Sequence, residues 1–326
     1  MISSTPIAHW SWGERGRDVD LIFEAVRRFS AALEVLNRHR LGTPHDGQVS
    51  VKVSELGSSS VLSQRNYLVT STLEDRIRES VKAGNIGAVE VYASCDGLLE
   101  TNNGSMATEG LFSLSVDVSE SYFTVALSTF SDAWMLYNLK GERNDSLHRL
   151  NQPRLEKLLE DLSEELGTEV DPEDPTKLGI ATEQGVENHF DNDGSASDVW
   201  GRFEIPQRNS IFSHTPPFRS TYRREATGQV AFFPVYGAGE VLGYLWASDV
   251  EGAASFEPRD KADLAGYHAG LMWLERLQGA FDRGLTPSAA LEILKNSPTD
   301  KNSGRIPDES STMEVDFWDL RRIAGD

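Results

Sequence analysis

Apolar residues in the first half of the chain recur three and four positions apart in several stretches, which is the spacing of one helix face. One such stretch runs from Leu21 to Leu36 and follows Asp18 or Asp20, either of which can cap a helix. A second begins at Ser71 or Thr72 and stops near Gly84. We therefore expect two amphipathic helices before residue 85.

Other stretches alternate apolar and polar residues, as strands with one solvent-facing side do. The clearest are 48–56, 87–95, 111–118 and 122–130, and the last two are close enough to form an antiparallel hairpin. Residues 132–141 predict one further strand. A leucine-lined helix is expected to start at Pro153, because proline is favoured in the first turn of a helix, and to end at Gly167. This pattern predicts a domain of mainly antiparallel strands covered by amphipathic helices, which is the α+β class.

The second half of the chain also predicts strands and amphipathic helices, but fewer of them. Two apolar strands separated by Gly237, Ala238 and Gly239 predict a hairpin over 230–248, with Pro234 favouring an edge position. A long helix is expected within 259–283 and a shorter one after Thr286. The remaining residues are mostly polar, with a few apolar ones from Phe317 onward that can dock as a helical turn.

The length of 326 residues suits two domains. We expect an N-terminal α+β domain over 1–168, an acidic connecting segment over 169–198, a C-terminal α+β domain over 199–297 and a polar tail over 298–326.

Negative charge is concentrated in the middle of the chain. From Glu156 to Asp198 there are fourteen Asp and Glu against two Lys, within a protein of formal net charge −20. This balance repels phosphate backbones, so nucleic acid is not an expected partner. The same field attracts basic protein surfaces and accelerates encounter with them, although acidity also serves solubility alone.

No motif identifies a catalytic, cofactor or metal site. Gly237, Gly239 and Gly243 superficially resemble a dinucleotide fingerprint, but a strand follows them where the pyrophosphate needs a helix. The run DNDGSASD at 191–198 has oxygen ligands at calcium-loop spacing, yet Ala196 and Arg202 stand where an EF-hand needs Gly and Glu. We expect no cofactor and no metal, and the absence of a catalytic motif favours a non-enzymatic protein while leaving an enzyme open as an alternative.

Compartment and membrane association follow from equally simple features. Cys95 is the only cysteine, so no intrachain disulfide can form. The N-terminal stretch has no basic region followed by an apolar run, and no segment has enough consecutive apolar residues to span a bilayer. We expect a cytoplasmic protein.

Several segments carry a resemblance to other proteins: LYNLKG, PRLEKLLEDLSEELG, EVDPEDPT, DVWGRFEIP and VLGYLWASD. With them the chain resembles uncharacterised soluble actinobacterial proteins over most of 89–298. Its acidic, motif-free, two-part character is also similar to that of bacterial toxin-immunity proteins. Neither resemblance implies a functional residue.

Three functional hypotheses remain. The leading one is a non-enzymatic binding protein of the immunity or antitoxin type, whose carboxylates meet a basic partner such as a toxin. Its expected binding residues are Glu160, Asp161, Glu164, Glu165, Asp171, Glu173 and Asp174. The second is a small-molecule sensor, GAF-like or profilin-like, built on the 230–248 hairpin and using Arg219, Arg223, Arg224, Tyr244 and Trp246. The third is an enzyme of unknown reaction.

Overall fold

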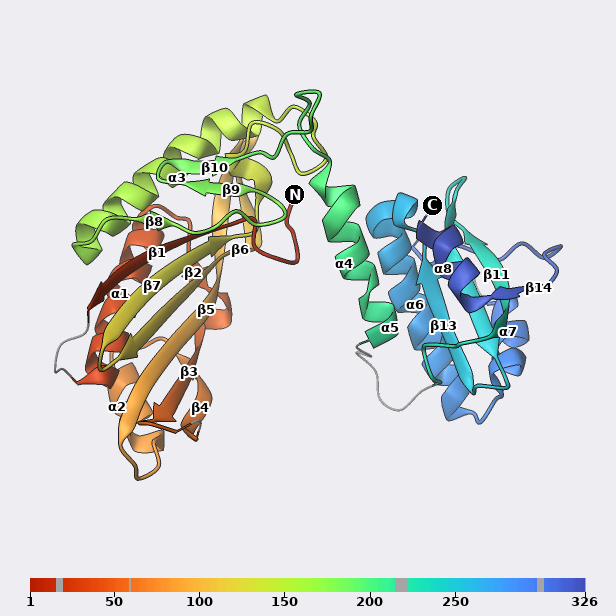
Figure 1. Ribbon diagram of the computed structural model, residues 1–326, viewed down its shortest axis with the longest axis horizontal. Helices are drawn as coiled ribbons and strands as arrows, with labels where there is room; N and C mark the ends of the chain where they lie inside the picture. The colour runs from red at the N-terminus through yellow and green to blue at the C-terminus, as the bar shows by residue number, and fades with distance from the viewer. Residues whose placement is uncertain (16–19, 59, 215–221, 298–301, 326) are drawn as a thin grey trace. The chain divides into compact units, whose positions relative to one another are not determined.

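The structure is a computed structural model that describes residues 1–15, 20–58, 60–214, 222–297 and 302–325. The chain divides into two compact units, Met1–Val199 and Trp200–Asp326, called here the first and the second unit. Both contain antiparallel sheets with helices packed on them (Figure 1), so the predicted α+β class is confirmed.

An eight-stranded antiparallel sheet forms the centre of the first unit, with strand order β4-β3-β5-β6-β7-β1-β8 and β2 paired with β5. Its strands are β1 (Ala8–Arg15), β2 (Thr43–Pro44), β3 (Gln48–Glu55), β4 (Val61–Leu68), β5 (Ile86–Thr101), β6 (Gly104–Ser119), β7 (Tyr122–Thr129) and β8 (Asp171–Pro172). The hairpin predicted between 111–118 and 122–130 is confirmed as β6–β7, with Leu114 opposite Leu127. A separate two-stranded sheet contains β9 (Ile180–Thr182) and β10 (Gly185–Glu187).

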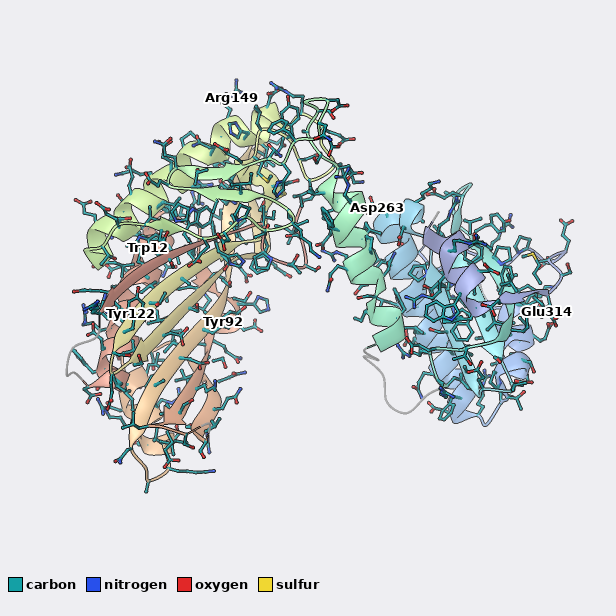
Figure 2. All side chains as sticks on the ribbon, in the orientation of Figure 1. Trp12, Tyr92, Tyr122, Arg149, Asp263 and Glu314 are labelled. Atoms are coloured by element: carbon teal, nitrogen blue, oxygen red, sulfur yellow. The ribbon has the colours of Figure 1, made fainter. Side chains whose placement is uncertain are left out.

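Alternation along the strands decides which face of this sheet is covered. Val91 and Val116 are fully buried, and α1 contacts the strands β5 and β6 on which they lie. The intervening positions point the other way, and Tyr92 is 47 % exposed (Figure 2).

The helices of the first unit are α1 (Leu21–Arg38), α2 (Leu73–Ser80) and α3 (Asp145–Leu166), with 3₁₀ turns η1 (His45–Gly47) and η2 (Asp132–Trp134). Asp20 caps α1 because its carboxylate accepts from the backbone N–H groups of Ile22 and Phe23. Gly167 ends α3, as predicted, and it adopts the left-handed conformation. The predicted start at Pro153 is wrong, because α3 begins two turns earlier and carries Pro153 in its interior.

The strand predicted over 132–141 is also wrong. Asp132 is buried and begins a 3₁₀ turn, and its side chain accepts from the N–H of Leu139 and pairs with the amino group of Met1. The indole of Trp134 donates to the Thr129 hydroxyl at 2.7 Å. These side-chain contacts fold the segment into a loop, which the apolar residues alone did not indicate.

Residues 169–198, expected as a connection, belong to the first unit, which ends at Val199. β8 pairs with β1 at the edge of the sheet. The indole of Trp10 donates to the carbonyl of Thr182 at 2.8 Å, and Leu178 is 2 % exposed. This segment therefore packs through its few apolar residues, while its carboxylates remain outside.

The second unit has a four-stranded antiparallel sheet of order β13-β12-β11-β14. Its strands are β11 (Gln229–Tyr236), β12 (Val241–Ser248), β13 (Ala253–Pro258) and β14 (Met313–Asp316). The predicted hairpin is confirmed as β11–β12, and Phe233 lies opposite Leu245. Pro234 is not on an edge strand, because β14 pairs with β11; this pairing ends at Phe232, so Pro234 lies beyond it.

Helices cover both faces of this smaller sheet. They are η3 (Trp200–Glu204, a π-helical turn), α4 (Ile205–Asn209), α5 (Ile211–His214), η4 (Asp260–Ala262), α6 (Asp263–Asp282), α7 (Pro287–Lys295) and α8 (Phe317–Gly325). Trp273 and Leu291, from α6 and α7, pack with Leu245 on one face, and Phe317 of α8 packs with Trp246 on the other. The tail expected to be polar thus supplies β14 and α8 to the second unit.

Candidate functional site

Two regions are candidate sites, one in each unit. The first is the acidic edge, defined as Glu160, Asp161, Glu164, Glu165, Asp171, Glu173 and Asp174. Its residues lie on the last turns of α3 and on β8 with the residues that follow it.

Local contacts hold these two segments next to the first strand. The indole of Trp12, in β1, donates to the Ser163 hydroxyl of α3 at 2.9 Å. β8 pairs with β1 in the sheet, and Asp171 lies opposite Ser11. The N–H of Glu173 donates to the carbonyl of His9 at 3.1 Å. β8 is an edge strand of the sheet, and Asp171, Glu173 and Asp174 are exposed.

Part of the acidic edge is neutralised within the protein. Asp161 contacts the Lys157 ammonium at 2.9 Å and His39 Nε2 at 2.7 Å, and these hydrogen bonds, that of Lys157 first, lower the pKa of Asp161. Lys157 also lies 3.1 Å from Glu160, and Arg38 lies 3.9 Å from Glu165.

The other four carboxylates of the acidic edge are exposed: Glu164, Asp171, Glu173 and Asp174. Within the described part of the chain, none of these four forms an ion pair within 4.0 Å. Negative charge without a close cation therefore remains where α3 ends and β8 begins.

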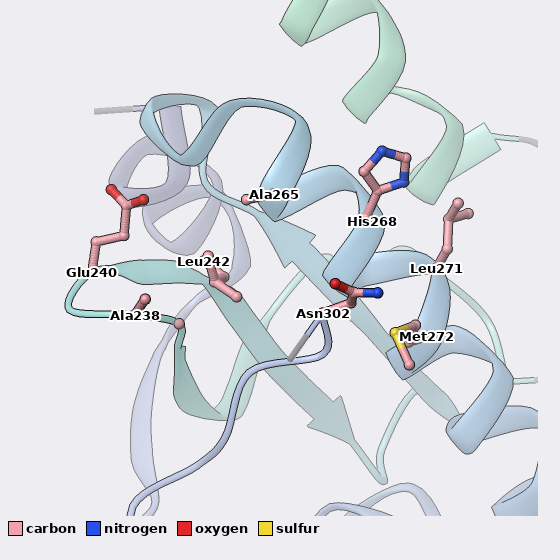
Figure 3. Close-up of a pocket in the computed structure, with 9 residues that line it drawn as sticks. Ala238, Glu240, Leu242, Ala265, His268, Leu271, Met272 and Asn302 are labelled. Carbon is pink, nitrogen blue, oxygen red and sulfur yellow. The ribbon is translucent and has the colours of Figure 1, made fainter. Parts of the chain in front are cut away.

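The second candidate is a pocket of about 590 Å³ in the second unit, between the β11–β12 turn and one face of α6 (Figure 3). Its wall is formed by Gly237, Ala238, Glu240, Leu242, Ala265, His268, Leu271, Met272 and Asn302. Gly237 is suited to the turn because a Cβ there would lie 2.9 Å from Leu242 Cδ2. Gly239 has φ +120°, which side chains rarely adopt.

The lining of this pocket combines an apolar wall with a few polar groups. Leu242, Leu271 and Met272 supply the apolar surface, and Glu240, His268 and Asn302 supply hydrogen-bonding groups. Such a mixture and volume are typical of sites for small organic molecules. No catalytic step follows from it, because the described lining residues do not place a nucleophile beside a base.

The ligand-binding residues expected from the sequence do not line this pocket. Tyr244 and Trp246 lie under α8, on the face of the sheet opposite α6, because alternate residues of a strand point to opposite faces. The backbone of Arg223 forms an isolated β-bridge with Ala253 of β13, Arg224 is buried, and Arg219 lies outside the described residues.

Sequence reasoning missed His268 and Glu240 as lining residues. Ala265, His268 and Met272 are three and four residues apart, so they share one face of α6. The small Ala265 leaves space on that face, and this spacing of residues is the feature of the sequence that could have predicted the pocket.

The loop at 191–198 forms a hydrogen-bonded turn. Asp193 accepts from both the N–H and the hydroxyl of Ser195, and the Ser197 hydroxyl donates to Asp191 at 2.8 Å. In the described ranges no three His, Cys, Asp or Glu side chains are grouped as metal ligands. Nor does any described helix have the length and apolar character needed to cross a membrane.

Comparisons with known proteins do not add a family to this description. No protein-family model matches the chain, and neither a curated protein nor a solved structure matches it. A function for this protein is therefore inferred from the acidic edge and from the pocket alone.

Proposed function

We propose that the protein is a non-enzymatic binding protein that recognises a basic partner protein through the acidic edge of its first unit. The observation that carries this proposal is the exposed group of Glu164, Asp171, Glu173 and Asp174, which has no compensating cation in ion-pair range among the described residues. Basic toxins belong to the partner class that this surface suits. We accordingly propose a cytoplasmic protein of the immunity type.

Long-range electrostatics and the rigidity of the elements that carry these carboxylates both favour such binding. A cluster of like charges on rigid elements raises the rate at which an oppositely charged protein finds its site, and this effect decreases as salt screens it. Glu160, Asp161 and Glu165 already have partners in the protein, so we assign them a smaller share of the binding energy.

The test compares two variants with equal changes in charge. One carries Glu164→Gln, Asp171→Asn, Glu173→Gln and Asp174→Asn. The control carries four neutralisations at other exposed carboxylates of the same unit: Asp75→Asn, Glu79→Gln, Glu109→Gln and Glu120→Gln.

Both variants and the wild type are used as bait for native lysate, and the captured proteins are identified by mass spectrometry. A basic protein should be captured by the wild type and the control variant, and its purified form should bind the acidic-edge variant about tenfold or more weakly. Equal binding by the acidic-edge variant would remove the proposal.

A second candidate function is small-molecule binding at the pocket shown in Figure 3, favoured by its volume of about 590 Å³. A thermal-shift screen against nucleotides and metabolites tests it. Ala265 is exposed and lines the pocket, so Ala265→Leu should fill space there with little cost in stability. A ligand that stabilises the wild type but not this variant would support the pocket, whereas equal stabilisation of both proteins would place the ligand elsewhere.

A further inference from the structure

A smaller and more polar pocket lies elsewhere in the second unit. It has a volume of about 150 Å³ and is lined by side chains from four elements: Asn209 of α4, Glu257 of β13, Asp260 of η4 and Arg321 of α8. Pro206, Pro258 and Ala324 form apolar walls around these groups. Neither candidate function described above uses any of them.

The polar groups are partly engaged with one another. Arg321 Nε lies 3.4 Å from Glu257 Oε1, and the amide nitrogen of Asn209 donates to Asp260 Oδ1 at 2.7 Å. The amide oxygen of Asn209 is buried and accepts no hydrogen bond from the described residues. A buried acceptor without a donor destabilises the folded protein, and this loss is recovered when a donor reaches it.

Charge and hydrogen-bonding capacity point to the same kind of ligand. The pocket contains two carboxyl groups, Glu257 and Asp260, against one guanidinium, Arg321. After these internal contacts, the acceptors that remain are oxygens of the two carboxyl groups and of Asn209, while the Arg321 guanidinium keeps further N–H donors. A complementary ligand therefore carries one positive charge and donates several hydrogen bonds.

We propose that this pocket binds a primary ammonium group, belonging either to a small free amine or to a lysine side chain. An ammonium is compact and has three N–H donors for the three acceptor residues. A quaternary ammonium matches the charge but has no donor. A calcium ion takes six to eight oxygen ligands, whereas here three residues supply oxygens next to a guanidinium.

Ionisation of Glu257 makes this binding dependent on pH. Burial raises the pKa of Glu257 to about 7; Arg321 lowers this pKa, whereas Asp260 and Glu225 raise it. Burial also raises the pKa of Asp260. Because the ammonium needs the Glu257 carboxylate, its affinity rises as the pH increases toward about 7 and levels off above that value.

The experiment is a ligand-observed NMR titration of the full chain with methylammonium chloride at constant ionic strength. At about pH 8 we expect saturable binding that is weakened about tenfold or more by Glu257→Gln, since a hydrogen bond to a charged group is lost. Glu314→Gln is the matched control, because Glu314 is exposed on β14 of the same unit (Figure 2). This control should leave the affinity unchanged.

A second variant and a second cation keep the test decisive. Asn209→Leu removes the unsatisfied acceptor at similar volume and should also weaken binding, which covers the case that Glu257→Gln does not fold. Tetramethylammonium should not bind. The proposal is overturned if methylammonium does not bind, or if it binds Glu257→Gln or Asn209→Leu as tightly as it binds the wild type. It is also overturned if tetramethylammonium binds as tightly as methylammonium, or if a low concentration of calcium displaces methylammonium.

The source of the ammonium is decided by a parallel titration with Nα-acetyl-lysine methylamide. Binding of this compound at least as tight as that of methylammonium assigns the pocket to a lysine side chain. Tighter binding of methylammonium assigns it to a free amine.

Discussion

The indole Nε1 of Trp12 donates a hydrogen bond to the hydroxyl of Ser163 at 2.9 Å, which joins β1 to the last turns of α3. Trp12 is 1 % exposed, so its N–H has no access to water. The acidic edge is held next to the sheet at this point.

Replacing Ser163 by alanine should therefore destabilise the first unit by about 1–3 kcal/mol, since it leaves the buried Trp12 donor unsatisfied. Urea unfolding followed by tryptophan fluorescence measures the effect. Ser121→Ala, at an exposed position, is the control and should change stability by less than about 0.5 kcal/mol. If both variants unfold at the same urea concentration, the contact does not stabilise the unit.

Two glycine-to-alanine substitutions should change stability in opposite directions. Gly167 has φ +70° at the end of α3, and a Cβ at this position would meet no described atom within 4 Å, so Gly167→Ala adds only backbone strain, about 1 kcal/mol. Gly279 lies inside α6, also with open space around it, and Gly279→Ala should stabilise by about 0.5–1 kcal/mol. Thermal unfolding of the two variants measures the signs, and equal signs would contradict this account.

Stability of the second unit should fall as pH rises through the range in which Glu257 ionises. Burial raises the pKa of Glu257 from 4.5 to about 7, so the folded state holds this proton more tightly than the unfolded state. The contribution is complete below pH 4.5 and is lost as pH rises to about 7, a change of about 3 kcal/mol.

Urea titrations between about pH 5 and about pH 8 check this direction. Glu257→Gln cannot ionise, so its stability should depend less on pH than that of the wild type. If the stability of the wild type rose over this pH range by more than that of the variant, the assignment of the pH dependence to Glu257 would be contradicted.

Cys95 should be unreactive in the folded protein. Its side chain is fully buried, and burial first, then the Asp96 charge, raises the pKa of its thiol to about 12. Because the thiolate is the reactive form, alkylation by iodoacetamide at neutral pH should be slow and should accelerate with added denaturant. Rapid labelling without denaturant would show that the strand carrying Cys95 opens locally.

Local patterns predicted much of the first unit. Val49, Val51 and Val53 alternate on β3 and are all buried, and Asp20, one of the two expected caps, caps α1; the other, Asp18, lies outside the described residues. These features follow from residues close in sequence, where period and capping chemistry act directly. Pro153 was misleading for the same reason: proline favours a first turn, but here it is exposed within a helix whose Leu155 and Leu158 pack in the core.

Side-chain contacts across long separations account for the errors and for the missed sites. Asp132 turns a predicted strand into a loop through contacts with Met1 and Leu139. The pocket around Glu257 gathers groups from α4, β13, η4 and α8, which no spacing rule connects. The acidic edge could be predicted because its residues are neighbours in the chain, whereas its internal partner His39 could not.

The position of β14 and α8 also bears on how the chain matures during translation. The first unit is complete at residue 199 and can fold while later residues are still being synthesised. In the second unit, Trp246 and Val230 stay uncovered until Phe317 and Leu320 have left the ribosome. During that interval the nascent chain exposes an apolar sheet face, and this is when we expect chaperones to engage it.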